Sequence, residues 1–497
     1  MHSNHPVWGV PQNTRNFPTL EADLRVDVAI VGGGITGLTT ALLLADAGKR
    51  VALLEGRQLG SGVTGCTTAH LTEAVDIRYH RLVSKFGLEG ARAVRSSSRD
   101  AIELLAKLSQ YAAPDCGFER LNGYLFTESR DRLDELEAEL QAAAHCGASV
   151  ERVMAPLPFG VAGGICFADQ AQLNPAPYLT GLTERLASGR VRLFESVSML
   201  DVEGVGPLRV VTDRGHSVVA DHVVLATHAP FAKLTLQLKL AQYRSYVVAG
   251  RVASTPPGLF WDMADPYHYV RRALVDGYSY AIVGGEDHRT GEVPSGGPDA
   301  PFTALEAYAA RLGVPAERRW SAQVVESADG LPFIGKPDSD RNLYVATGFG
   351  GNGMTFGTLS AMLIADSVMG RDNPYAELYR PSRSKPLAAL SAVVSENVDT
   401  ALHLVGDHVR PVSTEPIADL PIGQGRVIKD GGERLAVYRD HDGKVHALSS
   451  VCTHQGCQVA FNAVERSWDC PCHGSRFDID GRVLDGPATR PLEKRSR

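Results

Sequence analysis

Residues 27–54 place a glycine-rich turn between a strand-like run and a helix-like run. Residues 27–31 form a short apolar segment rich in β-branched side chains, and residues 38–45 are mostly good helix formers. The turn between them, residues 32–37, reads G-G-G-I-T-G and so carries the spacing G-x-G-x-x-G. A second apolar run at residues 50–54 completes a strand–turn–helix–strand unit. This order predicts a parallel sheet in an α/β fold, and it is the context in which the glycine spacing indicates a dinucleotide site.

The three glycines of the G-x-G-x-x-G spacing each have a physical role in such a site. Gly32 allows the tight turn, Gly34 lets the backbone approach a pyrophosphate, and Gly37 lets the helix pack on the strand. The bare N–H groups at the helix N-terminus attract phosphate. Glu55 follows the second strand, where a carboxylate binds both ribose hydroxyls and repels a 2′-phosphate. The pattern therefore predicts NAD or FAD and disfavours NADP.

Three later segments favour FAD over NAD. Residues 221–230 form a strand that ends in a turn of small residues, as in flavoproteins whose chain returns to the cofactor. Residues 342–348 form another strand, which a glycine-rich turn at 350–355 connects to an apolar helix. A second helix N-terminus of this kind suits the electron-rich edge of a reduced flavin. The third segment reads A-D-G-L-P-F-I-G at residues 328–335.

These segments resemble the D-amino-acid-oxidase-like family of FAD oxidoreductases over roughly residues 20–380. The resemblance implies an FAD-binding Rossmann-type domain combined with an antiparallel-sheet substrate domain. Some relatives have a histidine bonded to the flavin where this chain has Cys66, so a histidyl link is excluded here. A thiol packed against the cofactor is favoured over a thioether link. By the same resemblance, the residues expected to line FAD are Gly32, Gly34, Gly37, Glu55, Thr67, Thr68, Val197, Gly348, Gly351, Asn352, Gly353, Met354 and Thr355.

Two short segments near the C-terminus hold cysteines and histidines at matching positions. The first reads C-T-H-Q-G-C at residues 452–457, and the second reads C-P-C-H-G-S at residues 470–475. A [2Fe-2S] cluster with two thiolates on one iron and two imidazoles on the other needs one cysteine and one histidine from each loop. Zinc accepts similar ligands, but a zinc site requires neither six such residues nor the glycines Gly456 and Gly474. The pattern predicts a redox metal site, with zinc or a structural cysteine cluster as the alternatives.

Both loops resemble those of the Rieske proteins of respiratory cytochrome bc-type complexes. The respiratory proteins usually carry a tyrosine two residues after the serine of the second loop, and this chain has Ser475 followed by Phe477. With one hydroxyl donor fewer to stabilise the reduced cluster, we expect a reduction potential below that of the respiratory centres. The resemblance implies that the cluster ligands are Cys452, His454, Cys470 and His473 and that Cys457 and Cys472 form a disulfide.

The whole chain resembles bacterial FAD-dependent oxidoreductases that are fused to a C-terminal Rieske domain. We expect an FAD-dependent oxidoreductase domain at residues 1–386, a linker helix at 387–408 and a small all-β Rieske [2Fe-2S] domain at 409–497. Within the first domain, nucleotide-binding parts are expected near residues 24–90, 150–245 and 318–380, and substrate-side parts near 91–149 and 246–317.

Composition limits the possible partners and compartments. The net charge is −7 with no long basic run, which argues against a nucleic-acid partner. No uncharged apolar run of about eighteen residues occurs, so no transmembrane segment is expected. Residues 1–15 lack the architecture of a signal peptide, which makes the cytoplasm the expected compartment. The remaining cysteines lack ligand spacing and are expected to be unpaired thiols: Cys66, Cys116, Cys146 and Cys166.

Residues 246–280 alternate in polarity and are rich in aromatic side chains. We expect them to form antiparallel strands that cover the reactive face of the flavin. Period-two geometry puts His268 and Arg272 on one face of such a strand. The guanidinium of Arg272 could hold a substrate carboxylate, and His268 and Tyr246 are further candidate catalytic residues. A surface strand with ordinary charges is the alternative interpretation.

No second strand–G-x-G-x-x-G–helix unit occurs between residues 120 and 320, which argues against a separate NAD(P)H-binding domain. We therefore expect an enzyme whose electrons come from a small organic substrate, an amine or amino acid oxidised at its C–N bond. Reduced FAD would pass them to the Rieske cluster and on to an unidentified acceptor. Two alternatives remain open: a flavin monooxygenase supplied with electrons by the cluster, and a redox carrier or sensor without turnover.

Overall fold

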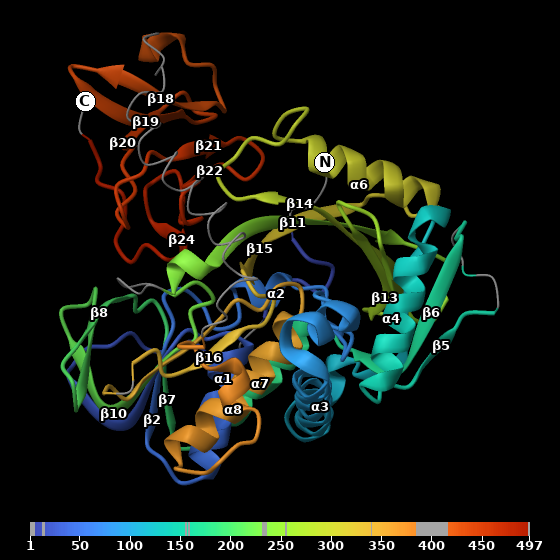
Figure 1. The fold of residues 1–497 in the computed structure, drawn as a ribbon. Helices are drawn as coiled ribbons and strands as arrows, with labels where there is room; N and C mark the ends of the chain where they lie inside the picture. The colour runs from blue at the N-terminus through green and yellow to red at the C-terminus, as the bar shows by residue number, and fades with distance from the viewer. Residues whose placement is uncertain are drawn as a thin grey trace.

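The computed structural model describes residues 5–11, 15–154, 157, 160–230, 236–253, 256–338, 340–383 and 416–495. The linker helix expected at residues 387–408 lies outside the described residues. Two sheets with their helices form the larger part of the molecule, and a C-terminal β-domain lies against them (Figure 1). In this described part of the chain, no helix is both long enough and apolar enough to cross a bilayer.

The first sheet carries the glycine-rich turn. In order across the sheet, its strands are β16 (Phe333–Gly335), β17 (Leu343–Thr347), β10 (Ser217–Leu225), β1 (Leu24–Val31), β2 (Val51–Leu54) and β7 (Val191–Phe194), with β9 (Leu208–Thr212) and β8 (Met199–Glu203) continuing from β10. The strands from β17 to β7 are parallel to their neighbours. β2 is buried along its whole length, as expected of an apolar strand that is covered on both faces.

The second sheet is antiparallel except where β12 and β4 run side by side in parallel. This agrees with the antiparallel strands expected from the alternating polarity of residues 246–280. In order, its strands are β15 (Arg318–Ser327), β11 (Leu240–Arg251), β14 (Tyr278–Arg289), β13 (His268–Val275), β12 (Leu259–Asp262), β4 (Glu119–Thr127), β6 (Gly163–Gln172) and β3 (His70–Leu71), with β5 (Val150–Arg152) beside β6.

Helices pack against both sheets and against one another. The α-helices are α1 (Ile35–Asp46), α2 (Val63–Cys66), α3 (Tyr79–Ala112), α4 (Leu133–His145), α5 (Pro175–Ala187), α6 (Ala300–Arg311), α7 (Gly353–Val368) and α8 (Ala376–Tyr379). The short 3₁₀ helices are η1 (Pro114–Cys116), η2 (Arg130–Arg132), η3 (Gln237–Lys239) and η4 (Ile417–Asp419). α1 and α7 lie side by side, and the N-termini of both helices line one cavity, as expected for a shared cofactor site. α6 packs on β11 and β14 of the second sheet.

The C-terminal domain consists of two small antiparallel sheets, as expected for a small all-β domain. One sheet contains β18 (Gly425–Asp430), β19 (Glu433–Arg439) and β20 (Val445–Ser449). The other contains β21 (Ala460–Asn462), β22 (Ser467–Asp469), β23 (Arg476–Phe477) and β24 (Val483–Asp485). Trp468 and Phe477 form the centre of its core and are fully buried. β24 lies on the side of this domain that meets the rest of the molecule (Figure 1).

We predict that Gly37→Ala destabilises the first sheet and its helix. A Cβ at this position would overlap the carbonyl oxygen of Gly32, and backbone cannot move away as a flexible side chain could. The expected loss is about 1–3 kcal/mol of stability, seen as a lower thermal midpoint. Gly160→Ala is the matched control, because a Cβ there meets no atom within 4 Å. Equal midpoints for the two variants would contradict the prediction.

Candidate functional site

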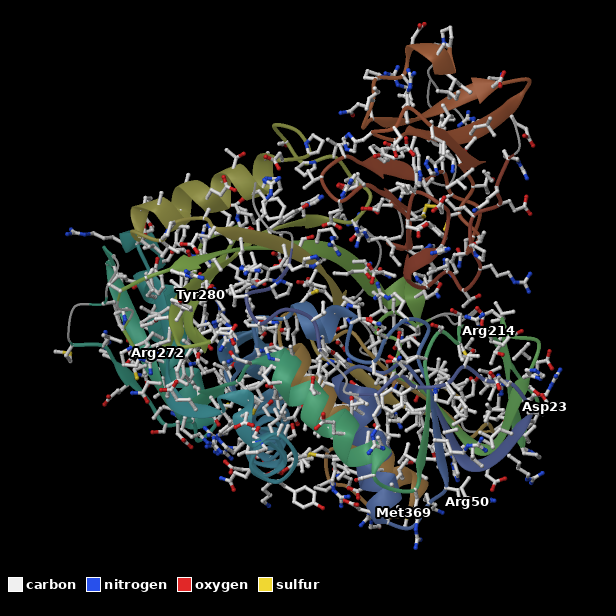
Figure 2. All side chains as sticks on the ribbon, turned by 180° about the vertical axis from the view of Figure 1, so that it is seen from behind. Asp23, Arg50, Arg214, Arg272, Tyr280 and Met369 are labelled. Atoms are coloured by element: carbon white, nitrogen blue, oxygen red, sulfur yellow. A yellow bond between two sulfur atoms is a disulfide. The ribbon has the colours of Figure 1, made fainter. Side chains whose placement is uncertain are left out.

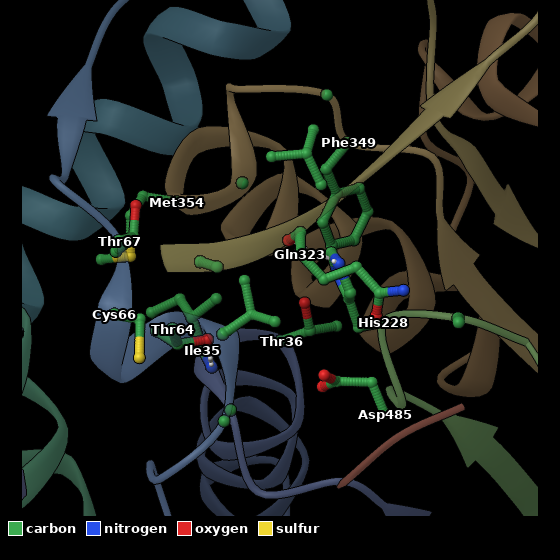
Figure 3. Close-up of a pocket in the computed structure, with 18 of the residues that line it drawn as sticks. Ile35, Thr36, Thr64, Cys66, Thr67, His228, Gln323, Phe349, Met354 and Asp485 are labelled. Atoms are coloured by element: carbon green, nitrogen blue, oxygen red, sulfur yellow. Dashed lines mark hydrogen bonds between the residues drawn. The ribbon is translucent and has the colours of Figure 1, made fainter. Parts of the chain in front are cut away.

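A cavity of about 580 Å³ lies at the carboxyl ends of β1, β10 and β17. The glycine-rich turn, the N-terminus of α7 and strands of the second sheet all contribute to its wall (Figure 3). This is the edge of a parallel sheet at which dinucleotides bind in α/β folds. The volume is in the range of ligand pockets, and the wall combines glycine backbone with few charged groups.

The turn before α1 has the form expected for a pyrophosphate cradle. Gly34 precedes the helix and has no side chain to cap it, and the Thr64 hydroxyl accepts a hydrogen bond from the Ile35 N–H at 3.2 Å. A Cβ on Gly34 would lie 2.8 Å from the hydroxyl oxygen of Thr64, so a side chain would fill the cradle. Glu55 accepts hydrogen bonds from the Gly33 N–H at 2.8 Å and the Arg57 N–H at 2.9 Å, which fixes its carboxylate at the cavity edge. These residues fit a bound FAD.

A second helix N-terminus, that of α7, also opens into the cavity. The side chain of its N-cap residue, Asn352, does not cap this helix. The carboxylate of Asp76 accepts a hydrogen bond from the Gly351 N–H at 2.6 Å, and Asp76 itself lines the cavity. Burial raises the pKa of Asp76 above its usual range.

Most of the residues that resemblance assigned to FAD line this cavity, and three do not. Gly37 is covered by the backbone of Gly32 and serves helix packing instead. Gly348 occupies a left-handed turn with φ +76° after β17, and Thr355 is fully buried within α7. The residues of that set in the lining are Gly32, Gly34, Glu55, Thr67, Thr68, Val197, Gly351, Asn352, Gly353 and Met354. Cys66 also lines the cavity, and burial raises the pKa of its thiol to about 11.

The three candidate catalytic residues lie outside the cavity lining as the structure describes it. Tyr246 is buried on the α6 side of the second sheet, where its ring stacks on His288. His268 is held between Asp262 and Glu286 at 2.8 and 3.1 Å.

Arg272 forms an ion pair with Glu119 at 2.7 Å, and 36 % of its side chain is exposed. It lies on the opposite side of the molecule from Asp23, Arg50 and Arg214, which flank strands of the first sheet (Figure 2). A guanidinium occupied in this way is not available to a substrate in the cavity.

The opposite face of the same strands meets the cavity. Tyr267, Tyr269 and Ser245 belong to its lining, and Asp287 lies directly behind them. The Tyr267 hydroxyl donates to the Asp287 carboxylate at 3.3 Å. Burial raises the pKa of Asp287 to about 7. Alternation along the strand separated the two faces correctly, but only the packing of α6 decides which face meets the cavity.

The two cysteine–histidine loops have the same backbone structure. In each, the N–H of the first cysteine donates to a carbonyl five residues later, from Cys452 to Cys457 and from Cys470 to Ser475, both at 2.8 Å. The glycines Gly456 and Gly474 both have positive φ, of +86° and +64°. Two equivalent loops therefore face each other, as two halves of one site.

The side chains of these loops fit a [2Fe-2S] cluster. Cys457 and Cys472 form a disulfide, which confirms the expected pairing. Cys452 and Cys470 are free, buried and in direct contact with each other. The Nδ1 atoms of His454 and His473 are buried without a hydrogen-bond partner among the described residues. A cluster between the loops would give both orphaned nitrogens and both thiols an iron to ligate.

The two imidazoles are held in the neutral form that metal ligation requires. Burial lowers the pKa of His454 and of His473 to about 4, and for His454 the neighbouring His473 adds to the effect. Their rings lie 4.9 Å apart between centroids. Cys470 also lies near the disulfide sulfurs of Cys457 and Cys472, but these two are bonded to each other and offer no thiolate.

Residues of the cavity wall contact the second cysteine–histidine loop directly. Gln323 of β15 lines the cavity, and its Nε2 donates to the Gly474 carbonyl of the second loop at 2.8 Å. Arg244 of β11 forms a buried ion pair with Glu465 of the C-terminal domain at 2.6 Å. Residues 483–489 of that domain contribute to the cavity wall. Nothing in the sequence indicated these contacts, since no local pattern signals a partner 151 or 221 residues away.

Comparison with known proteins agrees with this geometry. The model of the FAD dependent oxidoreductase family matches residues 27–367, and that of the Rieske [2Fe-2S] domain matches residues 411–495. A Bacillus subtilis (strain 168) protein named as a Rieske 2Fe-2S iron-sulfur protein is 32 % identical over 496 residues, covering 98 % of this chain and 96 % of its own. Gamma-glutamylputrescine oxidoreductase of Escherichia coli (strain K12) is 25 % identical over 71 % of this chain and 86 % of its own.

Solved structures share the fold of the larger part. Glycine oxidase from Geobacillus kaustophilus has a TM-score of 0.60 at 21 % identity, over 73 % of this chain and 100 % of its own. L-amino acid deaminase from Proteus vulgaris has a TM-score of 0.60 at 14 % identity, over 76 % of this chain and 100 % of its own. The chain therefore belongs to the FAD dependent oxidoreductase family, as an enzyme that uses FAD and carries a Rieske [2Fe-2S] domain at its C-terminal end.

Proposed function

We propose that the protein is a dehydrogenase that oxidises the C–N bond of an amine or amino acid and passes the electrons through the Rieske cluster to a separate acceptor. The carbon loses a hydride, the nitrogen lone pair forms a C=N bond, and water hydrolyses the imine to a carbonyl compound and an amine or ammonia. FAD supplies the hydride acceptor when bound, and the cluster supplies a one-electron acceptor. The two electrons leave the protein one at a time.

The observation that carries this proposal is the bridge made by Gln323. One side chain touches both the cavity that fits FAD and the loop that holds two expected cluster ligands, Cys470 and His473. The cluster ligands we propose are these two together with Cys452 and His454. A direct contact of this kind supports electron transfer between the two cofactors within the chain.

The substrate is proposed to lie between the flavin and the second sheet. Tyr267, Tyr269 and Ser245 would form its pocket, with the carboxyl group of Asp287 behind them to attract an amine. Arg271 is buried but bonds to Gln172 and the Leu173 carbonyl, so it holds the sheet rather than a substrate. The relationship to gamma-glutamylputrescine oxidoreductase supports a substrate with an amino group.

We place the reaction in the cytoplasm. The cysteines outside the cluster loops, Cys66, Cys116, Cys146 and Cys166, are all free thiols, which suits a reducing compartment. The Cys457–Cys472 disulfide is buried beside the cluster site, where reductants have little access.

Anaerobic mixing with amines and amino acids tests the function. With a true substrate, we expect flavin absorbance to bleach first and the cluster's paramagnetic signal to appear afterwards. His454→Ala should retain flavin bleaching but lose reduction of a one-electron acceptor, because the cluster lacks a ligand. Full acceptor turnover by the His454→Ala variant, or hydrogen peroxide formed in step with product, would remove the cluster from the pathway. Failure of every amine and amino acid to bleach the flavin would contradict the proposed reaction.

A pH dependence follows from Asp287. Its carboxyl group is neutral below about pH 7 and charged above it, because burial raises the folded-state pKa to about 7. An ammonium substrate should therefore bind more tightly as the pH rises through this range. The apparent substrate Kd, measured by flavin bleaching, should fall as the pH rises. Asp287→Asn should abolish this pH dependence. Asp213→Asn, an exposed carboxylate of the first sheet's periphery, should leave the profile unchanged.

The reduction potential depends on the hydroxyl groups near the cluster loops. Ser475 contacts the Cys452 sulfur, whereas Phe477 offers no donor and is fully buried. We expect Phe477→Tyr to raise the midpoint potential by roughly 40 mV, if one neutral hydrogen bond contributes about 1 kcal/mol to the reduced state. Ser475→Ala should lower it. Potentiometric titration followed by the cluster's spectrum measures both, and an unchanged or lower potential in Phe477→Tyr would refute the argument.

A further inference from the structure

Residues 483–489 of the Rieske domain form part of the wall of the FAD cavity. Of these, Val483, Leu484, Asp485, Gly486, Ala488 and Thr489 line it directly. Asp485 lies at the cavity in view of Thr36 and His228 of the FAD domain (Figure 3). The cavity is therefore not complete within residues 27–367, the part that matches the FAD dependent oxidoreductase family.

This wall is held in place from both sides. Within the Rieske domain, Arg476 binds the Asp485 carboxylate at 2.9 Å. Toward the FAD domain, the Thr489 hydroxyl donates to the Leu200 carbonyl at 3.3 Å, next to the lining residues Ser198 and Met199. Hydrogen bonds thus anchor the segment on both domains.

The charge of Asp485 restricts what it can contact in FAD. Burial opposes its ionisation, but the combined charges of Arg476, Arg57, Arg244 and His228 outweigh this and lower the pKa of Asp485. Its side chain is 16 % exposed, at the cavity. A carboxylate accepts hydrogen bonds from hydroxyl groups and repels a pyrophosphate. Of the groups that FAD carries, the hydroxyls of the ribityl chain and the ribose suit this position.

We propose that the Rieske domain completes the FAD site, with residues 483–489 covering the bound cofactor and Asp485 accepting a hydrogen bond from one of its sugar or ribityl hydroxyls. FAD leaves only when this domain moves away from the cavity. Cofactor binding and domain docking therefore stabilise each other, since a ligand that bridges two parts favours the state in which they are joined. This holds whether or not electrons flow between the two cofactors.

The rate of FAD release from the holoprotein tests the role of Asp485. Free flavin fluoresces, so release after dilution can be followed directly, and iron content shows that the cluster is intact. Asp485→Asn keeps the shape and an acceptor for Arg476 but weakens the bond to a hydroxyl, and release should be about tenfold faster. Asp442→Asn, in an exposed turn of the same domain, should release FAD at the rate of the parent protein.

A second variant tests domain docking without changing a residue of the cavity wall. Glu465 does not belong to the described lining of the cavity, yet it joins the two domains through Arg244. Glu465→Gln should therefore also accelerate FAD release. Hydrogen exchange gives an independent readout: FAD should slow exchange at residues 483–489 and leave β19 and β20 unchanged. Equal release rates in Asp485→Asn and the parent protein would overturn the assignment of Asp485, and equal exchange at 483–489 with and without FAD would overturn the shared wall.

Discussion

The buried guanidinium of Arg476 organises the junction between the two redox sites. It binds Asp469 at 3.1 Å, Asp485 at 2.9 Å and Ser467 at 3.0 Å, and it also contacts Glu465, with only 7 % of the side chain exposed. Three carboxylates around one guanidinium offset the cost of removing these charges from water, which an isolated buried charge could not do. Removing one partner of such a set typically costs about 3–5 kcal/mol, because the others remain buried without compensation.

The same set of charges reaches across the domain boundary. Glu465 is shared between Arg476 of the Rieske domain and Arg244 of β11, and these ion pairs lower the pKa of Glu465 to about 2 despite burial. A charge pair that is hydrogen-bonded on both sides is sensitive to geometry, so it fixes one docking position rather than allowing sliding contacts. In that position Gly474 meets Gln323, and the cluster loop lies against the FAD cavity.

Sequence reasoning recovered the parts of this site that are local in the chain. The turn around Gly34 and the loops holding Cys452 and Cys470 each lie within a few residues, and their backbone requirements are visible as glycine and cysteine spacing. The sequence did not show which face of the second sheet meets the cavity. Its alternation separated Tyr267 from His268, but which of them meets the cavity depends on α6, which covers the other side with its own apolar residues. Contacts between distant segments, such as Asp485 at the cavity, leave no pattern in the sequence.

The two domains are held together by a docked interface as well as by the covalent chain. A tether alone raises the effective concentration of the cluster near the flavin, with a gain that depends on tether length. A fixed interface removes that dependence, because Gln323 and the Gly474 carbonyl are already in contact and no search is needed. The interface then has two consequences with one cause. The contact between Gln323 and the cluster loop and the Rieske-domain residues in the cavity wall both belong to the docked position that the Arg244–Glu465 pair stabilises.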